Sequence, residues 1–118
     1  MRKYIRAHQD LAYLEDPERR VHIVFTCLER YDEKKKTVCP GLPGQLGLEC
    51  GAFMDILVRL SKVRDEDEDG QPVVRRHLLT DEYEDEDGVK YLAKNRGGRL
   101  GVQLWDPTMA RIIGVWRE

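Results

Sequence analysis

The sequence predicts an α/β fold with an antiparallel meander of strands in its C-terminal half. Three observations carry this prediction. An apolar, β-branched run lies at residues 19–31, apolar residues recur at helical spacing near both ends of the chain, and two acidic segments each end in Asp-Gly. A short apolar run of this kind is typical of a strand that is covered on both faces, as in an α/β sheet.

Composition limits the size and class of the protein. The chain has 118 residues, enough for one domain with a modest core. Charged residues make up 36% of it but the net charge is -2, so global charge says nothing about nucleic acid. No apolar run approaches the ~18 residues of a membrane span, and charges occupy the N-terminus where a signal peptide is apolar. We therefore expect a soluble, cytoplasmic protein with no membrane partner.

Residues 1–15 are expected to form a helix, because Ile5, His8, Leu11 and Leu14 recur at helical spacing. No Ser, Thr, Asp or Asn precedes this helix to cap it. The chain is therefore expected to begin within an element, either as a piece of a larger protein or as a natural half-domain.

The central elements follow from local composition. After the buried strand expected within 19–31, residues 32–44 contain two prolines, two glycines and a lysine triplet, which predicts an irregular loop. Residues 45–54 suit a short helix that glycine allows to pack closely on a sheet.

Three strands are expected in the second half, at residues 55–63, 72–83 and 89–95. The acidic segments between them end in Asp-Gly, which favours tight hairpins and hence an antiparallel meander. A terminal helix follows, with Asp106 as its N-cap and Pro107 at its first position. Its apolar face is expected to consist of Met109, Ile112, Ile113 and Trp116.

No metal site is expected. Asp65, Asp67 and Asp69 match the opening of a calcium-binding loop, but Arg76 stands where that loop needs a bidentate carboxylate. The cysteines are odd in number and lack a C-x-x-C spacing, which argues against zinc and against a disulfide framework. They are Cys27, Cys39 and Cys50. The three histidines are scattered, and no nucleophile–base set is visible.

The order of these elements resembles the C-terminal half of a RecA-type P-loop ATPase core. The stretch VHIVFTCLERYDEKKKTVCPGLPGQLGLECGAFMDILVRL, followed by YLAKNRGGRLG, resembles phage-encoded RecA-like ATPases of the recombination and single-strand annealing type. The resemblance covers residues 1–105. It implies a partial RecA-like three-layer core with a C-terminal antiparallel strand meander, in a protein of DNA recombination or replication.

The nucleotide-binding motifs of that family are absent from this sequence. No G-x-x-x-x-G-K-[ST] motif occurs, and neither does the acidic strand end that holds magnesium. The resemblance therefore implies ATP and magnesium for the complete domain, neither cofactor for this chain alone, and no hydrolysis by this chain alone. The expected partners are further copies of the chain or the upstream half of an ATPase core, together with single-stranded DNA.

The resemblance also implies roles for individual residues. Cations at the end of the 89–95 strand would reach the nucleotide bound by a neighbouring subunit, so Lys94 and Arg96 are the candidate catalytic fingers. Asn95, between them, is the third candidate nucleotide-binding residue, and Arg99 is a weaker one. The plainer alternative is a strand end with solvated cations and a Gly-Gly turn.

Two further assignments come from the same resemblance. Thr26 is the candidate catalytic sensor of the γ-phosphate, with Glu29 behind it. The alternative is a structural role, in which Thr26 is buried and its hydroxyl is hydrogen-bonded within a sheet. The loop from residue 30 to 44 corresponds to the DNA-facing loop, unless its charges are simply solvated. The candidate DNA-binding residues are Arg30, Tyr31, Lys34, Lys35 and Lys36.

A second function class stays open beside the ATPase reading. A non-catalytic interaction module, docking on a complete ATPase or on another partner, would have the same sequence features. An unrelated small α/β protein is a third alternative, because each motif taken singly is weakly specific.

Overall fold

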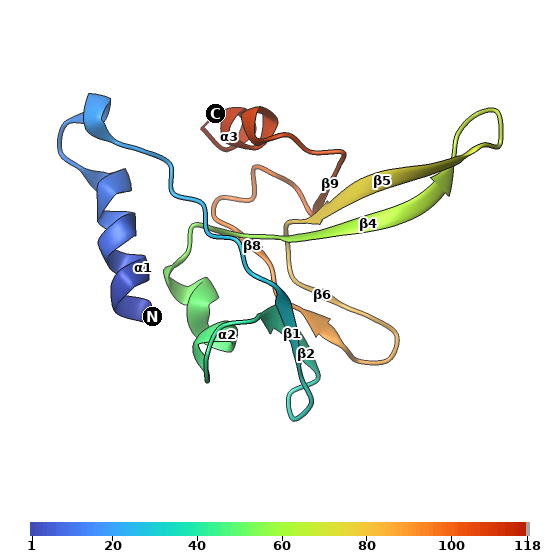
Figure 1. Cartoon of the computed structure of the whole chain (residues 1–118), viewed down its shortest axis with the longest axis horizontal. Helices are drawn as coiled ribbons and strands as arrows, with labels where there is room; N and C mark the ends of the chain where they lie inside the picture. Colours follow the sequence, from blue (N-terminus) through green and yellow to red (C-terminus); the bar gives the residue numbers. More distant parts are fainter. Residues whose placement is uncertain (118) are drawn as a thin grey trace.

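The computed structural model describes residues 1–117, with Trp116 and Arg117 described by their backbone only. In this range the protein is a mixed α/β structure in which most elements are strands. The strands form three small sheets, with orders β1-β2-β7-β6, β4-β5-β9 and β3-β8 (Figure 1). The predicted α/β class is therefore found, with the strands divided among three sheets.

The N-terminal helix is present over the first part of its expected range. Helix α1 spans Arg2–Gln9 and continues as a 3₁₀ turn at Asp10–Tyr13. Ile5 is buried, and the side chain of Gln9 donates a hydrogen bond to the carbonyl oxygen of Phe53 at 2.7 Å. These contacts attach α1 to the segment that follows α2.

The prediction of a buried strand within residues 19–31 was wrong for most of this range. Only Glu29–Asp32 forms a strand, β1, and residues 21–28 belong to neither helix nor strand. Val24 is 61% exposed and Leu28 is 88% exposed. The run has the composition of a central strand, but a strand needs a neighbour, and residues 1–117 place none beside it. Figure 1 shows it crossing from the side of α1 to β1 as an extended light-blue connection.

The expected irregular loop at 32–44 is largely a hairpin. Strand β1 pairs antiparallel with β2, Thr37–Pro40, through a turn in which Lys36 has a φ of 47°. The carboxylate of Asp32 accepts a hydrogen bond from the backbone N–H of Lys35 at 2.9 Å. This local side-chain bond closes the turn, which composition alone did not reveal.

The short central helix was predicted correctly. Helix α2 spans Leu46–Glu49 and leads into a 3₁₀ turn at Cys50–Phe53. Gly47 is buried against β2, and a Cβ atom added to it would lie 2.4 Å from the carbonyl oxygen of Pro40. Glycine at this position therefore allows α2 to approach β2 closely.

Both Asp-Gly turns connect antiparallel strands, as predicted. Strands β4, Arg59–Glu66, and β5, Pro72–Leu79, form the longest hairpin. Strands β6, Tyr83–Glu84, and β7, Lys90–Tyr91, form the second.

The strands do not continue as a single meander. Strand β5 pairs with β9, Gln103–Trp105, and β7 pairs parallel with β2. Strand β8, Lys94–Asn95, pairs with β3, Ile56–Leu57. The expected strands 72–83 and 89–95 are therefore each divided, because successive parts of them pair in different sheets.

The terminal helix is present, but its expected N-cap is wrong. Helix α3 spans Met109–Arg117, and the hydroxyl of Thr108 accepts a hydrogen bond from the backbone N–H of Arg111. Asp106 has a φ of 48°, and its carboxylate instead accepts hydrogen bonds from the β5 residues Arg75 and Arg76. The side chain of Trp116, expected on the apolar face, lies outside the described residues.

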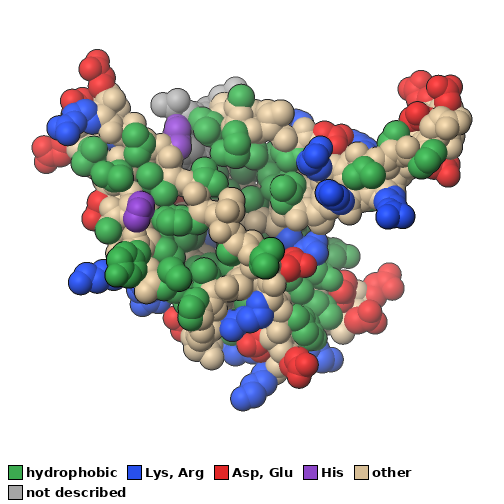
Figure 2. Space-filling view, viewed as in Figure 1, with side chains coloured by type: hydrophobic (Ala, Val, Ile, Leu, Met, Phe, Trp, Pro, Cys, Tyr) green, Lys and Arg blue, Asp and Glu red, His purple; other side chains and the backbone are tan. Residues whose placement is uncertain are grey.

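The buried core is small for a chain of this length. Its buried residues are Ile5, Thr37, Cys39, Gly47, Cys50, Leu78, Thr80, Ala93 and Leu100. The radius of gyration is 16.1 Å, whereas a compact domain of this size would have about 13.5 Å. Figure 2 shows hydrophobic side chains spread over the visible face. In the described part of the chain, no helix has the length and apolar character needed to cross a membrane.

Replacing Gly47 by alanine should destabilise the fold by about 1–3 kcal/mol, because the new methyl group would press against the backbone of β2. The matched control is Gly114→Ala in α3, where nothing lies within 4 Å of the added Cβ atom. This control should stabilise the protein by about 0.5–1 kcal/mol. Urea unfolding followed by circular dichroism measures both changes, and an equal effect of the two substitutions would contradict the close packing of α2 on β2.

Candidate functional site

The lysine, asparagine and arginine of the K-N-R-G-G stretch lie together at the end of β8. Strand β8 pairs with β3 for only two residues before the chain turns away. Gly97, Gly98 and Gly101 all have positive φ, at 84°, 68° and 72°. Side chains with a Cβ atom rarely adopt these angles, so the glycines are what allows the chain to turn between β8 and β9.

Asn95 holds this turn through all the hydrogen-bonding groups of its side chain. Its amide nitrogen donates to the carbonyl oxygens of Thr80 at 2.8 Å and Gly101 at 3.0 Å, and its amide oxygen accepts from the N–H of Leu100. Thr80 is fully buried, and its hydroxyl also donates to Gly101. Asn95 thus positions the turn, and its amide has no donor left for a nucleotide.

Lys94 is directed into the protein. Its Nζ atom donates a hydrogen bond to the carbonyl oxygen of Gly51 at 2.7 Å, and the residue is half-buried. This bond fastens β8 to the 3₁₀ turn after α2. To reach a nucleotide on another subunit, the Lys94 ammonium would have to leave Gly51.

Arg96 is the more accessible cation of the pair. Its side chain is 61% exposed, and its guanidinium lies 3.1 Å from one carboxylate oxygen of Asp55. The hydroxyl of Tyr13 donates a hydrogen bond to the other oxygen of Asp55, and this bond, with partial burial, raises the pKa of Tyr13 above its ordinary value. The sequence analysis did not find Asp55 and Tyr13, because residues 42 positions apart show no local pattern.

Thr26 and Glu29 lie outside this cluster. Thr26 is exposed on the unpaired segment 21–28, and its side chain makes no hydrogen bond within the described residues. The alternative of a buried threonine bonded within a sheet therefore does not apply. Glu29 accepts two hydrogen bonds from the guanidinium of Arg59, at 2.7 and 3.2 Å, and this contact lowers its pKa.

The candidate DNA-binding residues are divided between the interior and the turn of the β1–β2 hairpin. Arg30 is half-buried, and its guanidinium donates to the carbonyl oxygen of Gly44 at 3.0 Å. Tyr31 is 47% exposed, and residues 34–36 are exposed at the hairpin turn. Figure 1 places this turn well apart from β8, at the bottom of the view.

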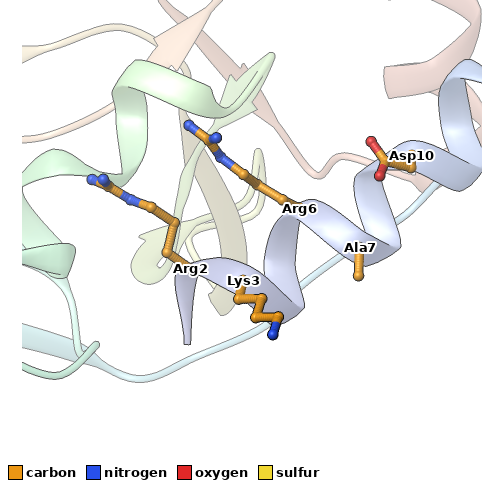
Figure 3. A pocket seen from close by; sticks show the side chains of 5 residues that line it. All are labelled: Arg2, Lys3, Arg6, Ala7 and Asp10. Carbon is orange, nitrogen blue, oxygen red and sulfur yellow. The ribbon is translucent and has the colours of Figure 1, made fainter.

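A hollow of about 560 Å³ lies along α1 and is lined by Arg2, Lys3, Arg6, Ala7 and Asp10 (Figure 3). The side chains of Arg2 and Arg6 extend to the same side, as expected for positions four apart on a helix. Arg2 is already paired with Glu49 and lies over the ring of Phe53. Since α1 and the turn after it supply the whole lining, the hollow has no opposing wall. Within residues 1–117, no group of three metal-ligating side chains is present.

Replacing Asn95 by alanine should lower the free energy of unfolding by about 2–3 kcal/mol, because it leaves the buried carbonyl of Thr80 without this donor. Chemical unfolding measures the loss. The control is Gln71→Ala, which removes an exposed amide at the β4–β5 turn and should change stability by less than about 0.5 kcal/mol. A loss at Asn95 no larger than at Gln71 would contradict its positioning role.

Comparisons with known proteins add no relative. No protein-family model matches this chain, and no match was found among curated proteins or among solved structures. The functional interpretation therefore rests on three features of the molecule: the cationic turn after β8, the charged β1–β2 turn and the exposed apolar segment.

Proposed function

We propose that this chain acts as the C-terminal part of a phage RecA-like ATPase core in DNA recombination or replication. In this role it contributes cations to a nucleotide bound by a neighbouring subunit and a charged hairpin to single-stranded DNA. The observation that carries the proposal is the exposed apolar segment at residues 21–28.

This segment has the chemistry of a central strand. Its apolar side chains alternate to both sides of an extended backbone, the pattern of a strand that is covered on both faces. Four of the large ones are between 45% and 88% exposed. They are Val21, Val24, Phe25 and Leu28. Burying a side chain of this size contributes about 1.5–3 kcal/mol, so covering all four would stabilise a complex by several kcal/mol.

The small core and extended shape support the same proposal. A RecA-like three-layer core would place 21–28 within a larger sheet, paired to strands that residues 1–117 do not supply. In the described structure the backbone N–H groups of 21–28 have one bond to another backbone group, from Val21 to Leu11. The carbonyl oxygen of Leu28 accepts a hydrogen bond from the N–H of Gly41 at 2.6 Å. The remaining backbone groups, which have no such bond within the described residues, and the apolar side chains suit the same kind of partner, another β-strand.

The cationic turn after β8 suits contact with a nucleotide that a neighbouring subunit binds. Arg96 is largely exposed and is held by a single carboxylate, so it can exchange Asp55 for a phosphate. Lys94 needs a larger rearrangement. The described residues do not fit a complete ATP and magnesium site, because they contain no group of three side chains that could hold a metal ion. Nucleotide binding would belong to the rest of the complete core.

A non-catalytic interaction module is the second candidate. The observation that favours it is that Lys94 and Arg96 are both bonded within the chain, to Gly51 and Asp55. In such a module the cations would fix β8, and residues 21–28 would still be the docking segment.

Sedimentation velocity tests the docking segment on the chain itself. We expect concentration-dependent association of residues 1–118, and we expect Phe25→Asp together with Leu28→Asp to abolish it, since buried carboxylates would be desolvated. The control is Val102→Asp, which places the same charge on another exposed apolar side chain and should leave association unchanged. A monodisperse monomer at high concentration would count against both candidate functions.

Turnover measurements separate the two candidates. In a complete ATPase containing this chain, Arg96→Ala or Lys94→Ala should lower DNA-stimulated turnover by at least about 100-fold and leave nucleotide affinity nearly intact. Mixing either variant with a variant inactivated at the phosphate-binding loop should restore part of the activity, because some junctions regain both intact parts. Lys90→Ala is the control cation. Normal turnover of the finger variants would favour the interaction module.

A further inference from the structure

Strands β4 and β5 extend beyond the sheet as a two-stranded arm. Strand β9 pairs with β5 only at His77–Leu79, so the part of the hairpin from Lys62 to Arg76 has no third strand. Figure 1 shows this arm projecting from the body of the protein. No third strand therefore flanks this part of the hairpin in the described residues.

One face of the arm is occupied by contacts with β9. Arg75 lies over the ring of Trp105 at 4.6 Å and pairs with Asp106 at 3.1 Å. His77 also contacts Trp105, with ring centroids 4.7 Å apart, and hydrogen bonds to Gln103. This face is therefore covered in part by side chains of β9 and Asp106.

The opposite face is cationic and open. Because side chains alternate along a strand, the residues of the other parity share this face. At these positions the side chains are exposed along the arm. We call this surface the arm face, and it consists of Lys62, Arg64, Val74 and Arg76, with Glu66 and Pro72 on the same face at the tip.

The three cations of the arm face are close together on the two strands. Lys62 stands directly opposite Arg76, and Arg64 is two residues further along β4. None of the three forms an ion pair in the described part of the chain. Asp106 lies beside Arg76: its two oxygens accept from Arg75 and from the backbone N–H of Arg76, and the charges of both arginines contribute to its lowered pKa. Like charges directly opposite on neighbouring strands repel, and a bound polyanion would remove that repulsion.

The ends of the arm differ in charge. Its tip, residues 66–69, is entirely acidic. Figure 2 shows this tip in red, with blue side chains along the arm behind it. A polyanion would be repelled from the tip and attracted to the part nearer the body, which sets where along the arm it can lie.

We propose that the arm face binds the phosphate backbone of duplex nucleic acid. Cations two residues apart on a strand are separated by about 6.6–6.8 Å, and those directly opposite by less, so neighbouring phosphates can be met at once. The arm face contains no aromatic side chain, which disfavours the base stacking that single strands provide. The arm face shares no residue with the β1–β2 turn. Duplex binding by the arm face therefore does not depend on the proposed function.

The test is fluorescence anisotropy of a labelled DNA duplex titrated with the chain at several salt concentrations. We compare it with the triple variant Lys62→Gln, Arg64→Gln, Arg76→Gln. Each cation paired to a phosphate contributes about 0.9 to the slope of log affinity against log salt, so the triple variant should have a slope shallower by about 2.7. When salt rises from about 50 to 200 mM, the affinity of the triple variant should therefore fall by a factor about 40 times smaller than that of the unmodified chain. If the triple variant does not fold, Arg76→Gln alone should reduce the slope by about 0.9.

The control variant, Lys3→Gln, Arg6→Gln, Arg19→Gln, removes three cations from the N-terminal segment. Its slope should differ from that of the unmodified chain by less than one cation's share, about 0.9. Equal slopes for the arm variant and the unmodified chain would overturn the proposal, and so would equal losses in both triple variants. Tighter binding of a single strand than of the duplex would also overturn it. A poly-glutamate peptide that binds the arm face in place of the duplex would instead assign an acidic protein partner.

Discussion

The arrangement of the second half of this protein depends on one side-chain amide. Asn95 joins the end of β5, the glycine turn and the entry to β9 by bonding to Thr80, Leu100 and Gly101. Without that amide, the buried carbonyl of Thr80 would lose this donor, and the path between β8 and β9 would be held to Thr80 only by the bonds of Gly101 and Val102 to its hydroxyl and its N–H. The position of Arg96 follows directly, because it is the next residue in the same turn.

The three sheets are joined by a few polar side chains in place of a large apolar core. Arg59 of β4 pairs with Glu29 of β1 and lies over the ring of Tyr91 of β7, at 5.0 Å. Within the β4-β5-β9 sheet, Asp106 joins the end of β9 to β5 through Arg75, and the hydrogen bond from the backbone N–H of Arg76 is the first cause of its lowered pKa. Polar contacts of this kind fix geometry but bury little apolar area, so much apolar surface remains exposed.

Two open surfaces with opposite chemistry result from this construction. Residues 21–28 are apolar and expose backbone groups, which suits another strand. The arm face carries three cations that form no ion pair in the described residues, which suits a phosphate backbone. A protein in which one surface completes a sheet and another meets nucleic acid would bring its partner protein and its DNA together. The charged β1–β2 turn is a third feature, and its DNA contact stays a prediction.

The sequence by itself determined the local elements that short-range chemistry specifies. Asp-Gly predicted both tight hairpins, helical spacing predicted α1 and α3, and the glycines around residues 44–51 favoured the short helix α2, because these signals act within a few residues. It also predicted the Gly-Gly turn beside Lys94 and Arg96. Only the tertiary structure decided which strands pair, since β2 with β7 and β3 with β8 are contacts between distant segments. The same reason explains 21–28, whose composition specifies a strand but whose state depends on a neighbour. The direction of Lys94 toward Gly51, and of Arg96 toward Asp55, also depended on residues some 40 positions away.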